Sequence, residues 1–316
     1  MKLIDLFKLG MEMGMANDPR KDRVEEVLED NKKEYDEEKN KEYFNKSILW
    51  NPYDDSNILY GDEDTEIKNI AVGIDIETQE LLLIDRLKEK GQKIDLALAH
   101  HPEGKGLLGL YKMVKIQEDI LLKSGVSVSS AEKILDESFD KYSRSLMGLN
   151  YNRAVDAAKI LDIPFANMHT PADNMVHTFL ENLFEETKPY KLQDIIDTLM
   201  KEEEYKIASK NQNGPKIISG NKNSRVGKIQ IDVTGGVEAS DKIYEKLENA
   251  GVGTLIGMHM SEAHLKKAKE HNINVIMAGH MSSDSLGVNL ILDGIQKRDK
   301  NINILAMSGF TRVSRV

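Results

Sequence analysis

Histidines in this chain gather at the ends of predicted strands. The sequence holds eight histidines, and the five that directly follow apolar runs are His100, His101, His169, His259 and His280. In open α/β sheets the carboxyl ends of parallel strands converge on the ligand crevice, so these side chains are expected to lie close together. Asp173 and Asp284 follow two of the histidines at the spacing of one helical turn, which would project each His–Asp pair from one helix face.

Imidazole nitrogens and carboxylate oxygens are ligands that suit Zn, Mn, Fe, Co or Ni. The chain contains no cysteine, so thiolate ligands, disulfides and iron–sulfur clusters are excluded. His100 and His101 point to opposite sides of an extended backbone, which makes them awkward ligands for one ion and suits one ion each. The pattern therefore favours two divalent ions, of Zn, Fe or Mn, that share a bridging water and a bridging carboxylate.

Plainer roles are open for several of these residues. Asp173 can cap the helix that follows Pro171, and Asp284 can cap its own turn. A histidine at a strand end is commonly a hydrogen-bonded rim residue, and His259 fits that role as well as a functional one. The coincidence at strand ends favours function for His100, His101, Asp173 and His280, while His169 and His259 are our candidates for proton transfer.

The elements that must position these residues follow from hydrophobic patterning. Apolar runs predict strands at 68–77, 94–99, 163–168, 228–233, 254–258, 273–278 and 302–307, with helical patterns between them. Asp75 stands 26 positions before His101, and Asp232 stands 27 before His259. This spacing indicates a diverged duplication of one β–helix–β unit, and hence two similar α/β lobes with mixed, mostly parallel sheets.

Three regions follow from the same patterns. Residues 1–64 form a charged N-terminal helical extension, 65–185 a first α/β lobe with a helical insertion at about 107–161, and 186–316 a second α/β lobe. The net charge of −10 repels phosphate backbones, so nucleic acid is an unlikely partner. No apolar run is long enough for a membrane span, and the first residues lack the pattern of a secretory signal, so we expect a cytoplasmic protein.

The motifs resemble those of a known family. The segments at 99–102 (Ala-His-His-Pro), 169–174 (His-Thr-Pro-Ala-Asp-Asn) and 278–284 (Ala-Gly-His-Met-Ser-Ser-Asp) occur in the order found in the Nif-three-like family. The strand at 73–77 also fits its first strand. Members are described as dinuclear-metal-centre hexameric proteins and are often labelled type 2 GTP cyclohydrolase I.

The resemblance, which covers roughly residues 65 to 310, implies a metal-containing cleft between two lobes and a ring-shaped homo-hexamer. Carried over by position, the metal ligands are His100, His101, Asp173, His280 and Asp284. The family has a glutamate at the last position, and Asp284 is a shorter carboxylate with less reach. The stretch between His101 and His169 is also longer than usual in the family.

Two functions from different classes fit these residues. The first is a metal-dependent hydrolase that acts on a small molecule through a metal-bridging water, with a nucleotide implied by the cyclohydrolase label. The second is a metal-binding, metal-delivery or scaffold protein without turnover. The same ligands serve both functions, and the sequence carries no base- or ribose-reading motif.

Overall fold

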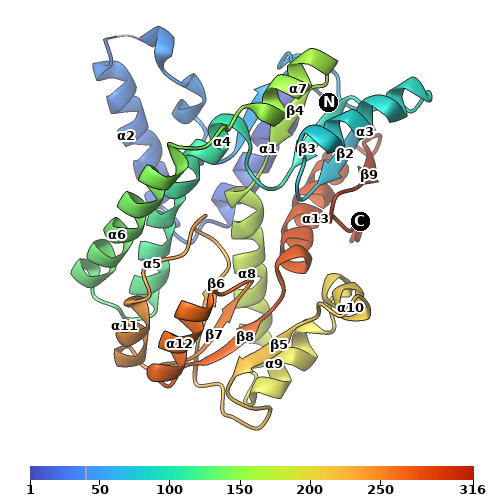
Figure 1. The fold of residues 1–316 in the computed structure, drawn as a ribbon. Coiled ribbons are helices and arrows are strands. Elements are labelled where there is room, and N and C mark those ends of the chain that lie inside the picture. The colour runs from blue at the N-terminus through green and yellow to red at the C-terminus, as the bar shows by residue number, and fades with distance from the viewer. Residues whose placement is uncertain (40) are drawn as a thin grey trace.

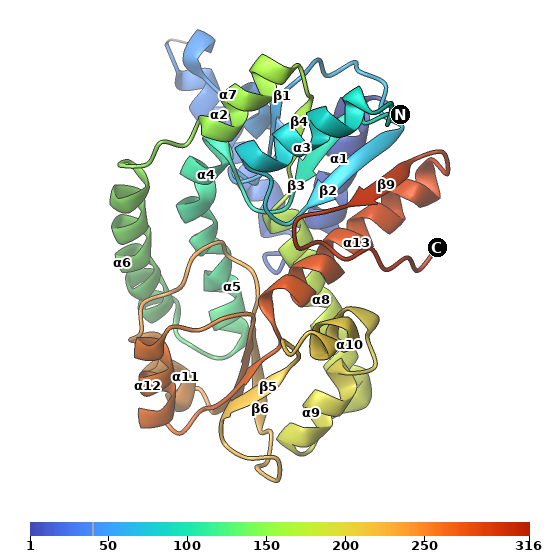
Figure 2. The ribbon, with the colours of Figure 1, turned by 45° about the vertical axis from the view of Figure 1, so that its right-hand side comes forward.

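Two α/β lobes, each with its own sheet, are joined by two long helices (Figures 1 and 2). The computed structural model describes residues 1–39 and 41–316. Figure 2 shows one sheet in the upper part of the molecule and the other in the lower part, with α8 (Thr170–Thr187) and α13 (His280–Arg298) running between them. The α/β class and the two lobes predicted from the sequence are confirmed.

The first sheet has five strands in the order β1-β4-β3-β2-β9. Their bounds are β1 (Asn57–Tyr60), β4 (Phe165–Asn167), β3 (Leu96–Ala99), β2 (Asn69–Gly73) and β9 (Asn303–Ala306). All neighbours pair in parallel except β1, which is antiparallel to β4. Every residue of β3 and β4 is buried, as expected for parallel strands covered on both faces.

The second sheet repeats this arrangement with four strands in the order β5-β8-β7-β6. Their bounds are β5 (Lys216–Ser219), β8 (Asn274–Met277), β7 (Val252–Gly257) and β6 (Lys228–Asp232). β5 is antiparallel to β8, as β1 is to β4, and both antiparallel pairs contain a register shift. The four strands of the second sheet thus correspond to β1, β4, β3 and β2 of the first, and β9 has no counterpart; this agrees with the duplication inferred from the Asp–His spacing.

The remaining helices cover the sheets and connect the lobes. Helices against the first sheet or its edges are α1 (Leu3–Ala16), α3 (Thr78–Glu89) and α7 (Arg153–Leu161), and those of the second lobe are α9 (Leu192–Leu199), α10 (Glu203–Lys210), α11 (Ile243–Asn249) and α12 (Glu262–Glu270). α2 (Arg23–Glu37) is followed by the short 3-10 helices η1 (Lys41–Tyr43) and η2 (Lys46–Leu49). Among the described residues, no helix combines the length and hydropathy that crossing a lipid bilayer requires.

The chain passes between the lobes more often than the sequence-based division expects. β1 lies in the expected N-terminal extension but pairs within the first sheet, and β9 lies in the expected second lobe but also joins the first sheet. α1 is likewise part of the first core, with Leu3, Leu6 and Met11 fully buried. α2 and η2 fit an exposed extension, because Val24 is the one buried residue of α2 and η2 has none.

The helical insertion packs against the second lobe. It contains α4 (Gly104–Gly109), the 3-10 helix η3 (Leu110–Lys115), α5 (Ile116–Lys123) and α6 (Val128–Leu146), whereas α7, which also falls within the predicted 107–161, packs in the core of the first lobe. Val114, Leu121 and Leu135 of the insertion share an apolar core with Tyr244 and Leu247 of α11. Burial of these side chains stabilises the contact, so the insertion spans the space between the lobes on one side, as Figure 1 shows.

The crossing of α8 and α13 brings the functional ends of the two lobes together. Gly287 of α13 lies so close to α8 that a Cβ atom there would collide with the Ala172 carbonyl oxygen and the Val176 side chain. The missing side chain lets the helices approach backbone to backbone. Asp173 lies beside this crossing on α8, and Asp284 lies one turn before it on α13.

Candidate metal centre

Five of the predicted site residues meet at the carboxyl ends of the strands. His100 and His101 directly follow β3, where their N–H groups donate to the carbonyl oxygens of Gly73 and Ile74, each at 2.9 Å. His280 is the first residue of α13, directly after β8 and Gly279. Gly279 has a φ of 110°, a conformation that favours glycine and allows the sharp turn from strand to helix. Asp173 lies in the first turn of α8, and Asp284 lies on α13 four residues after His280.

The first group of ligand atoms surrounds His100. Its Nε2 lies 3.5 Å from Oδ1 of Asp173 and 3.7 Å from Oδ1 of Asp284. His100 and Asp284 are fully or almost fully buried, and Asp173 is 5% exposed. One atom from each of the three residues lies within 4.8 Å of the others, so one cation could contact all three.

The second group surrounds His101. Oδ2 of Asp284 lies 3.5 Å from Nε2 of His101 and 3.4 Å from Nε2 of His280. These three residues also offer ligand atoms within 4.8 Å of one another. The two oxygens of Asp284 thus face different groups, and Asp284 is the only residue that belongs to both among the described residues. Although an aspartate side chain is shorter than the glutamate expected from the family resemblance, Asp284 faces both groups.

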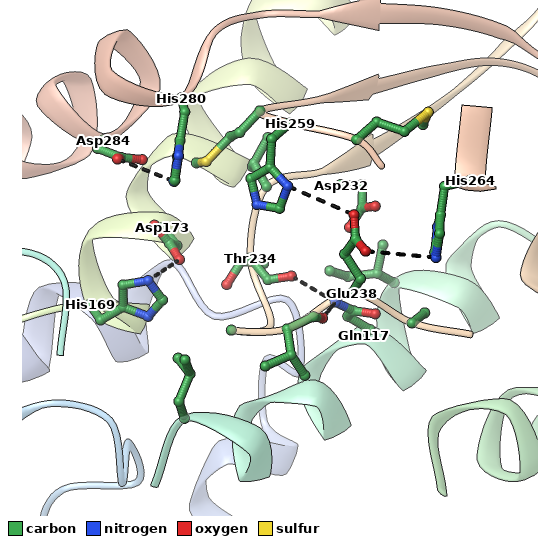
Figure 3. A pocket seen from close by; sticks show the side chains of 18 of the residues that line it. Gln117, His169, Asp173, Asp232, Thr234, Glu238, His259, His264, His280 and Asp284 are labelled. Atoms are coloured by element: carbon green, nitrogen blue, oxygen red, sulfur yellow. Dashed lines mark hydrogen bonds and ion pairs between the residues drawn. The ribbon is translucent and has the colours of Figure 1, made fainter. Parts of the chain in front are cut away.

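His169 lies closer to the cluster than a separate proton carrier needs to be. Its Nε2 is 3.7 Å from Oδ2 of Asp173, and Figure 3 shows the two side chains facing one another. His169 also offers a nitrogen within 4.8 Å of those of His100 and His101. The geometry fits His169 as a further ligand, whereas the sequence suggested proton transfer.

Carboxylates and a carbonyl oxygen behind the rings hold the imidazoles in position. Nδ1 of His100 donates to the carbonyl oxygen of Met168 at 3.1 Å, and Nδ1 of His101 donates to Asp75 at 2.7 Å. Nδ1 of His169 donates to Oδ2 of Asp55 at 2.8 Å. Each bond leaves Nε2 as the free nitrogen that faces the cluster, as is usual for metal-binding histidines.

Sequence reasoning missed Asp55 as a site residue. The carboxylate is fully buried and also accepts a hydrogen bond from Oγ1 of Thr170 at 2.6 Å. Asp55 lies in an irregular segment before the first strand, where the acids alternate with asparagine and nothing distinguishes one from another. The position of Asp75 at the end of the first predicted strand of the repeated unit marks it in the sequence. Its contact with His101 depends on the fold.

The charges of the cluster are strongly coupled. Burial raises the pKa of the Asp173 carboxyl to about 8. Burial opposes ionisation of Asp284 as well, but the surrounding imidazoles outweigh it and lower the pKa. Burial alone would lower the pKa of His101, yet the carboxylates of Asp284 and Asp75 raise it to about 10. Burial holds the pKa of His100 well below its usual value, which keeps this ring neutral.

These residues fit a bound cation. Oδ1 of Asp173 and both oxygens of Asp284 are buried and accept no hydrogen bond from any described residue. A buried carboxylate without a partner is costly, and a metal ion offsets that cost. The donors are nitrogen and oxygen only, which matches Zn, Fe or Mn. Buried His and Asp groups of this protein could therefore hold metal ions.

A pocket of about 370 Å³ extends from the cluster to the second lobe (Figure 3). His259, 59% exposed in its side chain, stands between the two ends, with its ring centroid 5.0 Å from that of His280. Nδ1 of His259 lies 3.8 Å from Oε1 of Glu238, and Nε2 of His264 lies 3.8 Å from the other oxygen. His259 therefore lies beside the cluster and outside each of its ligand groups.

A known protein family matches most of this chain. The family model Duf34/NIF3 (NGG1p interacting factor 3) matches residues 41–311. The chain belongs to the DUF34/NIF3 family. The match includes the helical insertion and every residue of the cluster, and the resemblance seen in the sequence motifs is confirmed. No match is found among curated proteins.

A solved structure of a NIF3 superfamily protein shares the fold. A NIF3 superfamily protein from Sphaerobacter thermophilus is 24% identical, with a TM-score of 0.70 over 81% of this chain and 92% of that chain. Reduced HcgD from Methanocaldococcus jannaschii is 13% identical, with a TM-score of 0.48 over 80% and 89% of the two chains. TTHA1606 from Thermus thermophilus is 14% identical, with a TM-score of 0.46 over 83% and 92%. At these identities the likeness to S. thermophilus concerns the fold alone.

Proposed function

We propose that this DUF34/NIF3 protein binds two divalent metal ions and is a metal-dependent hydrolase. The observation that carries the proposal is the carboxylate of Asp284, whose unpartnered oxygens face two separate histidine groups. A carboxylate in that position suits a bridge between ions roughly 3.5–4 Å apart. When bound, the ions would polarise the substrate and lower the pKa of a water that they share.

The proposed ligands divide into two sets. His100, His169 and Asp173 would hold one ion, His101 and His280 would hold the other, and Asp284 would serve both. Asp55 and Asp75 would fix the rings of His169 and His101 from behind. This assignment gives His169 a ligand role in place of the proton transfer expected from the sequence.

His259 is the best-placed group for proton transfer. Its side chain is exposed to the pocket and lies next to His280. His280 itself belongs to a group of potential metal ligands, whereas His259 belongs to none. In a hydrolysis the water oxygen forms the new bond, the bond to the leaving group breaks, and the leaving group takes up a proton. His259 can deliver that proton from the pocket side.

Turnover of a substrate distinguishes a metal-dependent hydrolase from a metal-delivery protein. The metal-loaded protein is incubated with small amides, phosphoesters and nucleotides including GTP, and products are followed by mass spectrometry. Metal-dependent turnover of one class supports the hydrolase. No turnover of any class, together with rapid loss of both ions to a chelator, would instead support a metal carrier.

The expected hexamer and the cytoplasmic location stay predictions. Light scattering of the purified protein measures the first. A trimeric or monomeric mass would contradict the ring-shaped hexamer. It would not contradict the proposed metal centre, because its proposed ligands all come from one chain.

A further inference from the structure

The end of the pocket away from the metal cluster is acidic. Six carboxylates line the whole pocket, and no lysine or arginine does so among the residues that the structure describes. Four of the six lie at the cluster or close to His101 along the chain: Asp75, Glu103, Asp173 and Asp284. The other two, Asp232 and Glu238, belong to the second lobe, where Figure 3 shows them next to each other.

Asp232 is a carboxylate that accepts no hydrogen bond, although the imidazoles of His259 and His264 act on its charge from a distance. It ends β6 and is exposed within the pocket, and its side chain has no hydrogen bond or ion pair in the described part of the chain. The duplication makes this informative. Asp75, its equivalent in the first lobe, accepts a hydrogen bond from His101 at 2.7 Å. The equivalent histidine, His259, lies 3.8 Å from Glu238 instead and makes no such hydrogen bond to Asp232.

Apolar side chains line the space between the two ends. They are Leu110, Ile120 and Leu121 of the insertion together with Val233, Leu247 and Leu255 of the second lobe. A ligand that spans the pocket would therefore meet a metal centre, then an apolar wall, then two carboxylates. The metal end is a ligand-binding end in its own right, because the fully buried carboxylate of Asp284 there is unpartnered.

We propose that the substrate is a small molecule with a metal-coordinating, hydrolysable group at one end and a protonated amine at the other, held by Asp232 and Glu238. A charge-assisted pair between an ammonium group and a carboxylate is stronger than a neutral hydrogen bond. A triphosphate is a poor fit, since no lysine or arginine lines the pocket among the described residues. This inference rests on the proposed metal-dependent function and names its substrate class.

Alkyl hydroxamates test the inference, because the hydroxamate chelates the metal ions while the tail probes the far end. The zinc-loaded protein is titrated calorimetrically with hydroxamates whose tails end in an amine, a methyl or a carboxylate, over a range of tail lengths. We expect one length at which the amine tail binds about tenfold tighter than the methyl tail, with the carboxylate tail weakest.

Two variants assign the preference to its residues. Asp232→Asn and Glu238→Gln should each reduce the preference for the amine tail, whereas Asp197→Asn, an exposed site on α9, should keep it. Equal affinities for the three tails, or a preference that survives Asp232→Asn in a protein with an unchanged melting temperature, would overturn the inference alone. Failure of every hydroxamate to bind would overturn the metal-dependent function as well.

Discussion

Nε2 of His101 lies 3.5 Å from Oδ2 of Asp284, although 183 positions separate the two residues along the chain. His101 extends from the first sheet, and Asp284 lies on the helix that follows the last strand of the second sheet. The His–Asp cluster proposed as the metal centre is therefore built across the lobe boundary, and its geometry depends on the crossing of α8 and α13.

Asp55 should control metal affinity without contacting the metal. Asp55→Asn replaces the acceptor that holds Nδ1 of His169, so the ring loses its preferred orientation and tautomer. We expect about a 10- to 100-fold loss of metal affinity, measured by competition with a chromophoric chelator. Asp54→Asn is the matched control, because Asp54 pairs with Lys112 away from the cluster. Equal losses in the two variants would contradict the role given to Asp55.

Gly287 should be intolerant of even one added methyl group. In Gly287→Ala the new Cβ meets the backbone of Ala172, which cannot move without shifting α8. We expect a loss of about 1–3 kcal/mol in the free energy of unfolding, with weaker metal binding. Gly294→Ala on the same helix meets only the flexible end of Met13 and should cost less. Urea denaturation of the metal-free proteins compares them, and an equal cost at both positions would count against the crossing as the critical contact.

Metal binding should release protons. In the metal-free protein His101 has a pKa raised to about 10 by Asp284 and Asp75, and Asp173 has a pKa raised to about 8 by burial. Both are protonated at neutral pH, yet a metal needs a neutral imidazole and an ionised carboxylate. Affinity should therefore rise with pH, and the binding heat should depend on the ionisation enthalpy of the buffer. A heat that is the same in phosphate and Tris would contradict this.

The stability of the metal-free protein should fall as pH rises. The raised pKa of Asp173 means that the folded chain binds more protons than the unfolded chain between about pH 4 and pH 8. For His101 the pairing with Asp284 stabilises the fold below about pH 6.5 and is lost as pH rises toward 10. Both effects have the same sign. Thermal melts in EDTA should give a lower melting temperature at pH 9 than at pH 6, and the reverse order would show that other groups dominate.

His259 should matter for turnover and leave metal content unchanged. His259→Gln removes the proton donor on the pocket side but no ligand. Once a substrate is found, we expect its turnover to fall about 10²- to 10⁴-fold. His271→Gln is the control, because His271 pairs with Glu248 outside the pocket. A parallel loss of metal in His259→Gln would make His259 a ligand.

Much of this site could be predicted because its signals are local. The strand-end histidines and the His–Asp pairs one turn apart are visible in the sequence, and the equivalent spacing of Asp75–His101 and Asp232–His259 anticipated the matching sheets. Long-range pairing is different. β9 is a short apolar strand like its neighbours, and nothing in its own residues tells which sheet it joins.

The residues that sequence reasoning missed are those whose role depends on distant neighbours. Asp55 acts only through His169, which lies 114 positions later. The sequence predicts proton transfer for His169, and the ligand role proposed for it depends on how β4 and α8 present the ring. That Asp232 lacks the hydrogen bond made by Asp75 is visible only once His259 is seen to lie beside Glu238.

The metal content of the purified protein tests the central claim most directly. Elemental analysis of wild-type protein prepared without added metal is compared with that of Asp284→Asn after both are loaded and desalted. We expect about two ions per chain in the wild type and fewer than one in the variant, because Asp284 serves both groups. A wild type that retains no ion even after loading, or a variant that still holds two, would contradict the dinuclear centre.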